Sequence, residues 1–284
     1  MDSTKPDVLV TGATGTVGRQ VVTGLLDAGS TVRALVRDPA SVRLPEGAET
    51  AGGDLANPAS LKGALDGIGT VFLVWPFTSR RAAIEIAPAV IDEITRRARR
   101  VVYLSADAAS DDPASFWSSI EHVVEASGSE WTFLRPTGFA KNTLMWADQI
   151  RAGDVVRWPY GAASRSLIDE RDVAAVAVRA LTEDSHHGAT YVLSGPEALT
   201  QRDQVHAIGA ALGRTLRWED VPRDEARPAL VSAMGDAAFA DHALDTWAGF
   251  VDRPERTTST VNDVTGTPAH TMSDWASAHT SDFR

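Results

Sequence analysis

Three glycines near the start of the chain have the spacing of a phosphate-binding turn. Gly12, Gly15 and Gly18 form a GxxGxxG pattern between an apolar run at residues 8–10 and a stretch with helical apolar spacing. In such a turn the glycines permit a tight strand exit, a close approach of backbone to diphosphate, and close packing of helix on sheet. The N–H groups and the dipole at the helix start then favour an anion. The pattern predicts a dinucleotide site, and the alternative is a tight turn that binds nothing.

The end of the second predicted strand indicates which dinucleotide is bound. Residues 31–36 read as a strand that runs into Arg37 and Asp38. An acidic residue at this place holds the ribose hydroxyls of NAD, whereas an arginine accommodates the 2′-phosphate of NADP. Arg37 has a planar, permanently charged guanidinium that suits phosphate, and Arg19 and Arg33 are possible helpers. The sequence favours NADP(H), with two alternatives: that Asp38 holds a ribose, or that Arg37 is an ordinary surface residue.

Composition argues against several other classes of function. The chain has 284 residues, 43% of them hydrophobic, which is enough for one large domain or two lobes with a real core. Its net charge of −11 argues against nucleic acid as a partner, and the absence of cysteine excludes thiolate chemistry. No histidine and carboxylate residues stand at ligand spacing, so no metal site is predicted. No signal peptide and no apolar run near the roughly 20 residues of a membrane span is present. We therefore expect a cytoplasmic monomer or homodimer that acts on a small molecule away from membranes.

Alternating strands and helices predict an α/β fold with a doubly wound, Rossmann-like parallel sheet and a smaller, mostly helical C-terminal substrate lobe. Further strands are expected at residues 47–54, 70–74, 101–105, 131–134 and 191–193. Helices are expected at residues 61–66, 84–100, 116–127, 169–181, 204–212 and 224–250. We assign residues 1–136 and about 169–193 to an NADP(H)-binding domain, and residues 137–168 and 194–284 to the substrate lobe.

Aromatic side chains follow the predicted central strand at the edge where ligands of parallel sheets bind. Trp75 and Phe77 come directly after residues 70–74, so they are candidates for a pocket wall, with core packing as the alternative. Such a wall suits a flat, apolar substrate. Further candidates for the substrate pocket are Trp117, Phe139, Asn142 and Trp146.

Several motifs give nearly the whole chain a resemblance to one family. TGATGTVGR (11–19), VRALVRDP (32–39), GDLANPASL (53–61), EASGSEWTFLRPTGFAKN (125–142) and LIDERDVAAVA (167–177) are the clearest. The chain resembles the NmrA-like and isoflavone-reductase-like branch of the atypical short-chain dehydrogenase/reductases. The resemblance is specific for the branch and not for a reaction.

The resemblance implies a Rossmann-like domain and a small C-terminal lobe, with NADP(H) held between them. It implies that the diphosphate binds at the turn and the 2′-phosphate at Arg37. The implied cofactor residues are Thr14, Gly15, Thr16 and Val17 for the diphosphate, Asp54 and Leu55 for the adenine, and Val74, Trp75, Ser105 and Pro136 for the nicotinamide.

The chain departs from the family's pattern at the proton donor. Short-chain dehydrogenases carry a YxxxK pair, which by alignment on residues 126–128 falls on Trp117 and Glu121. An indole N–H donates a hydrogen bond but does not exchange its proton usefully near neutral pH. Asp107, near the position of the usual serine, and Tyr160 are the candidate catalytic groups, and Lys141 is another group able to handle protons. The alternative is structural in each case, and for Asp107 it is a cap.

Three functions fit these observations. The first is an NADPH-dependent reductase of a flat apolar acceptor, such as a quinone, a conjugated ketone or a secondary-metabolite intermediate, which takes hydride and then a proton from water. The second is an NmrA-like regulator that binds dinucleotide without turnover and signals to a protein partner. The third is an isomerase or epimerase that uses the same cofactor. The cofactor turn, the substituted YxxxK pair and the aromatic residues together favour the reductase.

Overall fold

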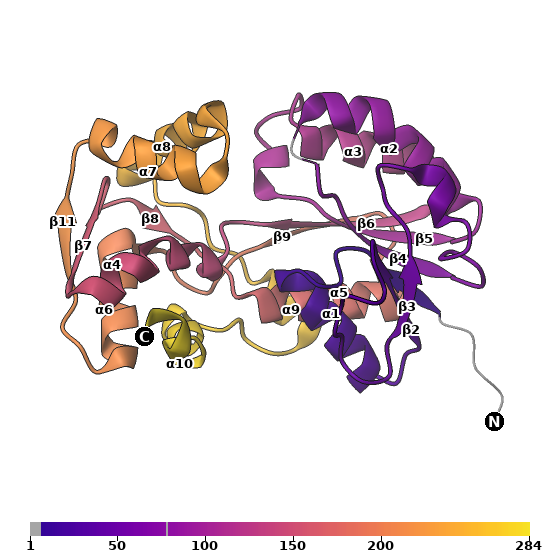
Figure 1. Cartoon of the computed structure of the whole chain (residues 1–284), viewed down its shortest axis with the longest axis horizontal. Coiled ribbons are helices and arrows are strands. Elements are labelled where there is room, and N and C mark those ends of the chain that lie inside the picture. Colours follow the sequence, from indigo (N-terminus) through magenta and orange to yellow (C-terminus); the bar gives the residue numbers. More distant parts are fainter. Residues whose placement is uncertain (1–6, 78) are drawn as a thin grey trace. The chain divides into compact units, whose positions relative to one another are not determined.

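The chain folds into two compact units, each with its own core. The computed structural model describes residues 7–77 and 79–284. Unit 1 contains the residues up to Thr137, Glu170–Leu193 and Thr260–Thr267. Unit 2 contains Gly138–Asp169, Ser194–Ser259 and Pro268–Arg284. The chain therefore passes from one unit to the other several times (Figure 1).

Unit 1 is built on a seven-stranded, wholly parallel sheet with the order β3-β2-β1-β4-β5-β6-β9. The strands are β1 (Val8–Val10), β2 (Val32–Val36), β3 (Glu49–Gly52), β4 (Thr70–Val74), β5 (Arg100–Leu104), β6 (Glu130–Pro136) and β9 (Ala189–Leu193). The sheet confirms the predicted Rossmann-like α/β fold. Its strand order reverses at β1, which lies between β2 and β4. In open parallel sheets this reversal marks the place, beyond the strand carboxyl ends, where ligands bind.

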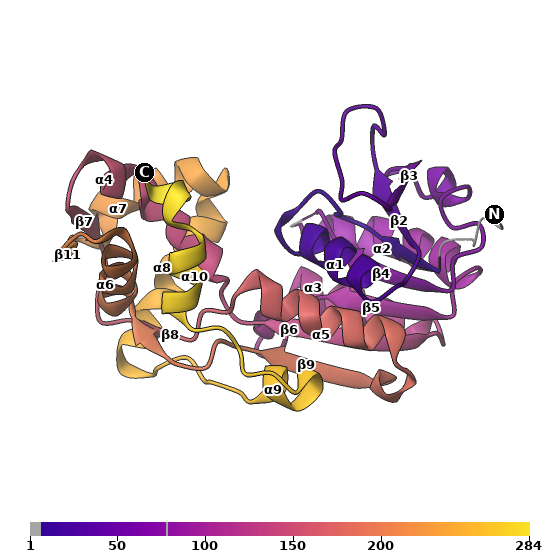
Figure 2. The same cartoon turned by 90° about the horizontal axis from the view of Figure 1, so that it is seen from below.

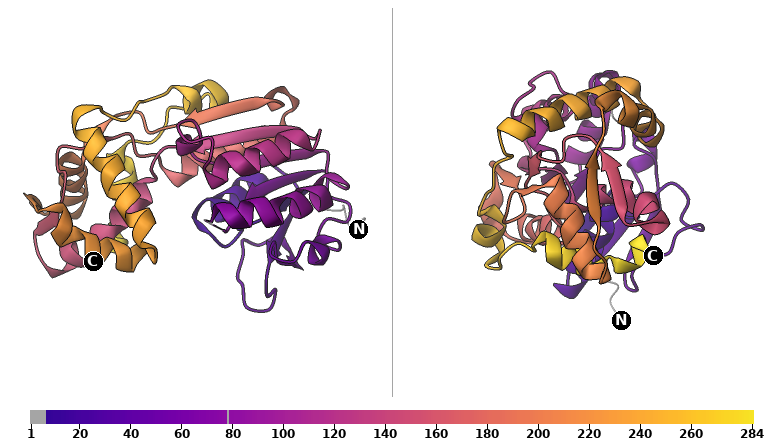
Figure 3. Two further views of the ribbon diagram at one scale, coloured as in Figure 1. Left: turned by 90° about the horizontal axis from the view of Figure 1, so that it is seen from above. Right: turned by 90° about the vertical axis from the view of Figure 1, so that its left-hand side faces the viewer.

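Helices cover both faces of this sheet. On one face lie α1 (Thr16–Asp27), α5 (Glu170–Thr182) and α9 (Thr260–Thr265), which pack on one another (Figure 2). On the other lie α2 (Arg80–Thr95) and α3 (Phe116–Ala126), the two purple helices side by side in the left view of Figure 3. Successive strand residues point to opposite faces, so Val71, Leu73, Val101 and Tyr103 pack beneath α2 and α3.

Unit 2 is mostly helical and carries two small sheets. Its helices are α4 (Ala147–Ala152), α6 (Gln201–Leu212), α7 (Arg223–Met234), α8 (Ala237–Asp252) and α10 (Met272–Ala278). One sheet pairs β8 (Ser164–Arg165) with β10 (Leu199–Thr200), and the other pairs β7 (Val155–Trp158) with β11 (Arg217–Asp220). Its core is rich in aromatic side chains, among them Trp146, Trp158, Trp247, Trp275 and Phe283.

Several predicted helices were wrong in their extent. Residues 61–66 do not form an α-helix: a short 3-10 helix, η1 (Pro58–Leu61), is followed by turns. The helix predicted at 224–250 is broken into α7 and α8, because Gly235 adopts a left-handed φ of +71° and Asp236 caps α8 by accepting from the Phe239 N–H. Within the described residues, no helix is long and apolar enough to cross a membrane.

The helix predicted at 84–100 spans Arg80–Thr95 instead. Ser79 caps its start by accepting a hydrogen bond from the Ala82 N–H. Ile84, the first residue of the predicted range, lies inside the helix and is exposed. Arg100, the last residue of the predicted range, is instead the first residue of β5 and is buried.

Arg100 connects three segments at the amino-terminal edge of the sheet. Its Nε lies 2.9 Å from Glu130 Oε2, and its two terminal nitrogens lie 2.5 Å from Asp184 Oδ1 and 2.7 Å from the Glu183 carbonyl. The guanidinium of Arg100, assisted by Arg99, holds the pKa of Glu130 below its usual range. Arg100 therefore ties β5 to the start of β6 and to the turn before β9.

Replacing Glu130 with glutamine should destabilise the protein in a pH-dependent way. The carboxylate contributes stability above its ordinary pKa of 4.5, and this contribution is lost as the pH falls through the lowered pKa. We expect E130Q to lower the free energy of unfolding by about 1–3 kcal/mol at neutral pH, with the difference from wild type vanishing in acid. Urea unfolding at several pH values measures this.

Glu85→Gln is the matched control, because Glu85 pairs with Arg81 on the surface of α2 with 57% of its side chain exposed. It should change stability by less than about 0.5 kcal/mol at any pH. An E130Q deficit that stays constant into acid would contradict this account of the Arg100 cluster.

Candidate functional site

The turn between β1 and α1 is packed too closely to accept side chains at Gly12 and Gly18. Gly12 has a φ of +61°, and the Gly15 N–H donates to the Gly12 carbonyl at 2.9 Å. A Cβ on Gly18 would stand 2.2 Å from the Gly12 carbonyl oxygen, and one on Gly12 would stand 2.9 Å from Val74 Cβ. Glycine is therefore required at both positions. The hydroxyl of Thr11, which accepts from the Val74 N–H at 2.7 Å, fixes the strand end beside β4.

The start of α1 presents backbone donors and has no side-chain cap. Gly15 is the N-cap residue, no side chain caps this end, and the first turn carries no acidic residue. The N–H groups of a first helical turn have no acceptor within the helix, and together with the dipole they favour an anion. Thr14 and Gly15 are exposed, so an anion can reach the turn. The geometry fits a diphosphate held on backbone N–H groups.

Arg37 stands directly after β2 with its guanidinium available. It is exposed, and in residues 7–77 and 79–284 it has no hydrogen-bonding or ionic partner. Asp38 turns the chain instead, because its carboxylate accepts from the Ala40 N–H at 3.0 Å. A free, permanently charged guanidinium at this strand end suits a phosphate.

The two predicted helpers of Arg37 are engaged elsewhere. Arg33 is buried, forms an ion pair with Glu49 at 3.0 Å, and donates to the carbonyls of Ala64 and Asp66, each at 2.9 Å. Its assignment as a helper was wrong, because Arg33 is the second residue of β2 and its guanidinium is held by Glu49 and by these two carbonyls, away from Arg37 at the strand end. Arg19 donates to the Arg43 carbonyl at 3.0 Å, which ties the loop after β2 to α1.

The residues expected at the adenine and nicotinamide lie at or just beyond the carboxyl ends of β3 to β6. Leu55 is buried in the core, while the Asp54 carboxylate accepts from the Ala56 N–H at 2.9 Å. Trp75 and Ser105 are buried, and within the described chain the Trp75 indole N–H and the Ser105 hydroxyl have no partner. Buried polar atoms normally find one, so two unpaired groups after neighbouring strands fit a site for a polar ligand.

Trp75 belongs to the core beneath α2, although its indole N–H has no partner. It is 8% exposed and packs edge-to-face on Phe77, with ring centroids 5.3 Å apart. Phe77 and Trp117 are only partly buried, and Trp117 lies against Phe116 with centroids 4.0 Å apart. Aromatic surface near this edge is therefore offered by Phe77 and Trp117, with Trp75 behind Phe77.

A buried ion pair, which the sequence did not reveal, lies close to the predicted Asp107. Glu121 accepts two hydrogen bonds from Arg135, at 2.9 Å from Nε and 2.6 Å from a terminal nitrogen. The third nitrogen of Arg135 donates to the Ser110 hydroxyl at 3.0 Å, and Ser110 in turn lies 3.4 Å from the Asp107 carboxylate. Burial, together with the Glu121 charge, raises the pKa of Tyr103 well above its usual value. Asp107 thus belongs to a hydrogen-bonded loop, consistent with the capping alternative.

The predicted residues of unit 2 are only partly brought together. Asn142 and Trp146 both line a small cavity of about 20 Å³, whereas Phe139 and Tyr160 do not. Trp146 is 2% exposed and has an indole N–H without a partner among the described residues. Tyr160 occupies a turn with a φ of +62°, and its carbonyl accepts from the Ala163 N–H. The other residues around the cavity are Thr143, Met145, Arg165, Leu167, Gln201, Gln204 and Trp247.

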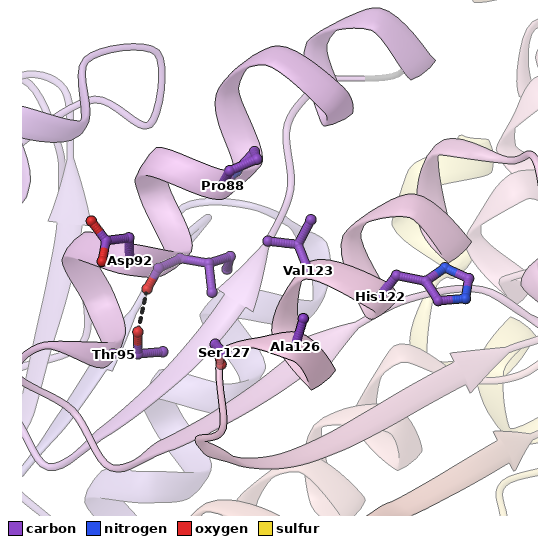
Figure 4. Close-up of a pocket in the computed structure, with 8 residues that line it drawn as sticks. Pro88, Asp92, Thr95, His122, Val123, Ala126 and Ser127 are labelled. Carbon is purple, nitrogen blue, oxygen red and sulfur yellow. Dashed lines mark hydrogen bonds between the residues drawn. The ribbon is translucent and has the colours of Figure 1, made fainter.

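A second hollow lies between α2 and α3, where no site residue was predicted (Figure 4). It measures about 440 Å³, is open, and is lined largely by apolar atoms. In Figure 4 Val123 points toward α2, while the ring of His122 points away from it. The His122 Nδ1 lies 2.7 Å from the Ser118 carbonyl. Within the described residues, no three histidine, aspartate or glutamate side chains are grouped as for a metal ion.

Replacing Gly18 with alanine should disrupt the turn. The added Cβ would collide with the Gly12 carbonyl, so we expect a loss of about 1–3 kcal/mol in unfolding free energy, the usual cost of overpacking. Gly63→Ala is the control, because a Cβ there meets only open space and should cost less than about 0.5 kcal/mol. Chemical denaturation of both variants measures the difference, and equal costs would contradict the close packing described here.

Comparisons with known proteins place the chain in a family. It is 39% identical to a (4-alkanoyl-5-oxo-2,5-dihydrofuran-3-yl)methyl phosphate reductase of Streptomyces griseus, over 97% of this chain and 99% of that one. It is 36% identical to an NAD(P)H azoreductase of Xenophilus azovorans, over the same shares. A quinone oxidoreductase of Escherichia coli crystallised with NADPH has the same fold, with a TM-score of 0.81, 24% identity, and coverage of 95% and 99%. Residues 4–241 match the sequence model of one family, and the chain therefore belongs to the NmrA-like family.

Proposed function

We propose that this protein is an NADPH-dependent reductase of flat, apolar, conjugated acceptors such as quinones and conjugated ketones. The observation that carries the proposal is the glycine turn, whose exposed backbone and uncapped helix start lie where the strand order reverses. The two relatives described above support a conjugated acceptor, because the acylated dihydrofuranone of one and the azo compound of the other both contain conjugated double bonds.

The residues of unit 1 suit each part of NADP(H). The turn at Thr14, Gly15, Thr16 and Val17 would hold the diphosphate through the backbone N–H groups at the start of α1 that have no acceptor within the helix, and Arg37 would hold the 2′-phosphate. The adenine would lie beside Asp54 and Leu55. The nicotinamide end would lie by Val74, Trp75, Ser105 and Pro136. The Trp75 N–H and the Ser105 hydroxyl have no hydrogen-bond partner among the described residues.

The protein's part in the reaction is to bind the cofactor and the acceptor and to orient them toward each other. The bound cofactor supplies a hydride. A conjugated acceptor spreads the resulting negative charge over its own oxygen or nitrogen atoms and takes a proton from water. This chemistry does not need the tyrosine and lysine of other short-chain dehydrogenases, whose positions we assign to Trp117 and Glu121. Neither Asp107, held in a loop network, nor Tyr160, held in a turn, is needed as the acid.

The substrate is proposed to contact partly buried aromatic side chains of unit 1. In unit 1, Phe77 and Trp117 are only partly buried and offer ring faces, while Trp75 supports Phe77 from the core. In unit 2, Asn142 is exposed and Phe139 partly so, whereas Trp146 is buried in the core of that unit. Ring faces suit stacking on a flat substrate.

NADPH oxidation by the purified protein tests this function. We expect oxidation that depends on an added quinone, azo dye or conjugated ketone, and that is faster with NADPH than with NADH. Absorbance at the nicotinamide band measures it. Tight NADPH binding without oxidation across the panel would contradict a reductase and favour a dinucleotide-sensing regulator or an isomerase.

Arg37→Ala should reduce the preference for NADPH. Loss of a charged contact to phosphate should weaken NADPH binding about tenfold or more and leave NADH binding nearly unchanged. Arg81→Ala, which removes a surface guanidinium that pairs only along α2, is the control. Titration of intrinsic tryptophan fluorescence measures both cofactors, and an unchanged ratio of the two dissociation constants for R37A would overturn this assignment.

A further inference from the structure

The Arg135–Glu121 pair joins three elements of unit 1 at one point. Arg135 is the last residue but one of β6, and Glu121 lies in the middle of α3. The Glu121 side chain is 6% exposed and both of its oxygens accept from the Arg135 guanidinium. A two-point contact between a planar guanidinium and a carboxylate fixes orientation as well as distance. Glu121 therefore holds Arg135 in one orientation.

The remaining terminal nitrogen of Arg135 reaches the loop between β5 and α3. This loop, residues 105–115, contains the short 3-10 helix η2 (Asp107–Ala109), and Arg135 donates to Ser110, the residue that ends it. From the other side the buried Ser118 hydroxyl lies 3.1 Å from the Ala109 carbonyl and 2.8 Å from the Asp112 carbonyl. The loop is thus held at two points, one of them charged.

The loop begins at Ser105, beyond the carboxyl end of β5. The Ser105 N–H donates to the Leu134 carbonyl at 2.8 Å, so the loop leaves the sheet beside the end of β6. Ligands of parallel sheets bind beyond this edge. Ser105, whose hydroxyl has no partner among the described residues, is the anchored first residue of this loop, and the residues that follow it continue beyond the same edge.

We propose that Arg135 is a positioning residue, which through Ser110 fixes the loop after Ser105 in the conformation that receives the nicotinamide end of NADPH. Glu121 acts through Arg135 by holding the guanidinium in place. The part of this inference that concerns NADPH rests on the proposed function. The part that concerns the order of the loop does not. The ion pair thus contributes to cofactor binding indirectly, through the loop, and neither residue touches the cofactor.

Ser110→Ala and Arg135→Lys in the full-length chain test the proposal. S110A removes only the hydroxyl, which lies on an exposed residue, so the fold should persist. R135K keeps a positive charge for Glu121 but loses the fork. Ser129→Ala is the matched control, since the Ser129 hydroxyl makes an exposed contact to Ser127 at 2.9 Å, in the turn just after α3.

Two measurements are made on each variant: hydrogen–deuterium exchange of peptides covering residues 105–115, and NADPH affinity by fluorescence titration. We expect both S110A and R135K to exchange faster in these peptides and to bind NADPH up to about tenfold more weakly, the value of one charge-assisted hydrogen bond. Thermal unfolding of S110A should stay near that of wild type, and S129A should match wild type in every assay. The double variant should be no worse than R135K, because R135K already breaks the contact to Ser110 that S110A removes.

Two results would overturn the proposal. One is unchanged exchange in S110A, which would mean that the contact does not order the loop. The other is faster exchange with unchanged NADPH affinity, which would mean that loop order does not matter for the cofactor. A wild-type protein that binds NADPH but oxidises none with any acceptor would refute the reductase and leave both of these readouts valid.

Discussion

The approach of α1 to the end of β1 depends on the absence of side chains at Gly12 and Gly18. The Gly12 carbonyl occupies the place that a Gly18 side chain would take, so the helix can start immediately beyond the strand. This contact puts the first turn of α1 at the carboxyl end of β1, the strand that lies between β2 and β4. The backbone donors of α1, the Arg37 guanidinium at the end of β2, and the unpaired groups after β4 and β5 then share that edge of the sheet. The site follows from a backbone contact, and charged side chains add selectivity to it.

The sequence predicted the elements of unit 1 where local pattern decides the structure. Continuous apolar runs such as residues 70–74 are buried on both faces, and that strand has the predicted bounds. The predictions were wrong where a single residue determines the end of a helix or the burial of a side chain. An apolar periodicity runs through residues 224–250, but the cap at Asp236 and the left-handed Gly235 divide it into two helices. In the sequence Arg100 looks like part of an arginine-rich helix end. In the structure it pairs with Glu130 and Asp184, which are distant in sequence.

In the candidate site too, the sequence predicted the features that depend on local signals and missed those that depend on long-range contacts. The glycine spacing and Arg37 are local signals, and the structure leaves both accessible. The fate of Arg33 depends on which face of β2 it occupies and on Glu49 of the next strand, which no spacing rule reveals. The aromatic residues were identified by residue type, and residue type does not distinguish a pocket wall from a core. Trp75 and Trp146 are buried among apolar neighbours, while Phe77 and Trp117 are partly exposed. The Glu121–Arg135 pair joins residues from a helix and a strand, so only the fold brings it into view.

The most direct test of the central claim is to follow the hydrogen itself. NADPH carrying deuterium at C4 of the nicotinamide would be supplied with a conjugated ketone, and the mass of the reduced product measured. The account predicts one deuterium per product molecule when the label is on one of the two C4 faces, and none when it is on the other, because a bound cofactor presents a single face. Reduced product without deuterium from either labelled form would mean that the hydride does not come from a dinucleotide held at this turn, and would contradict the account.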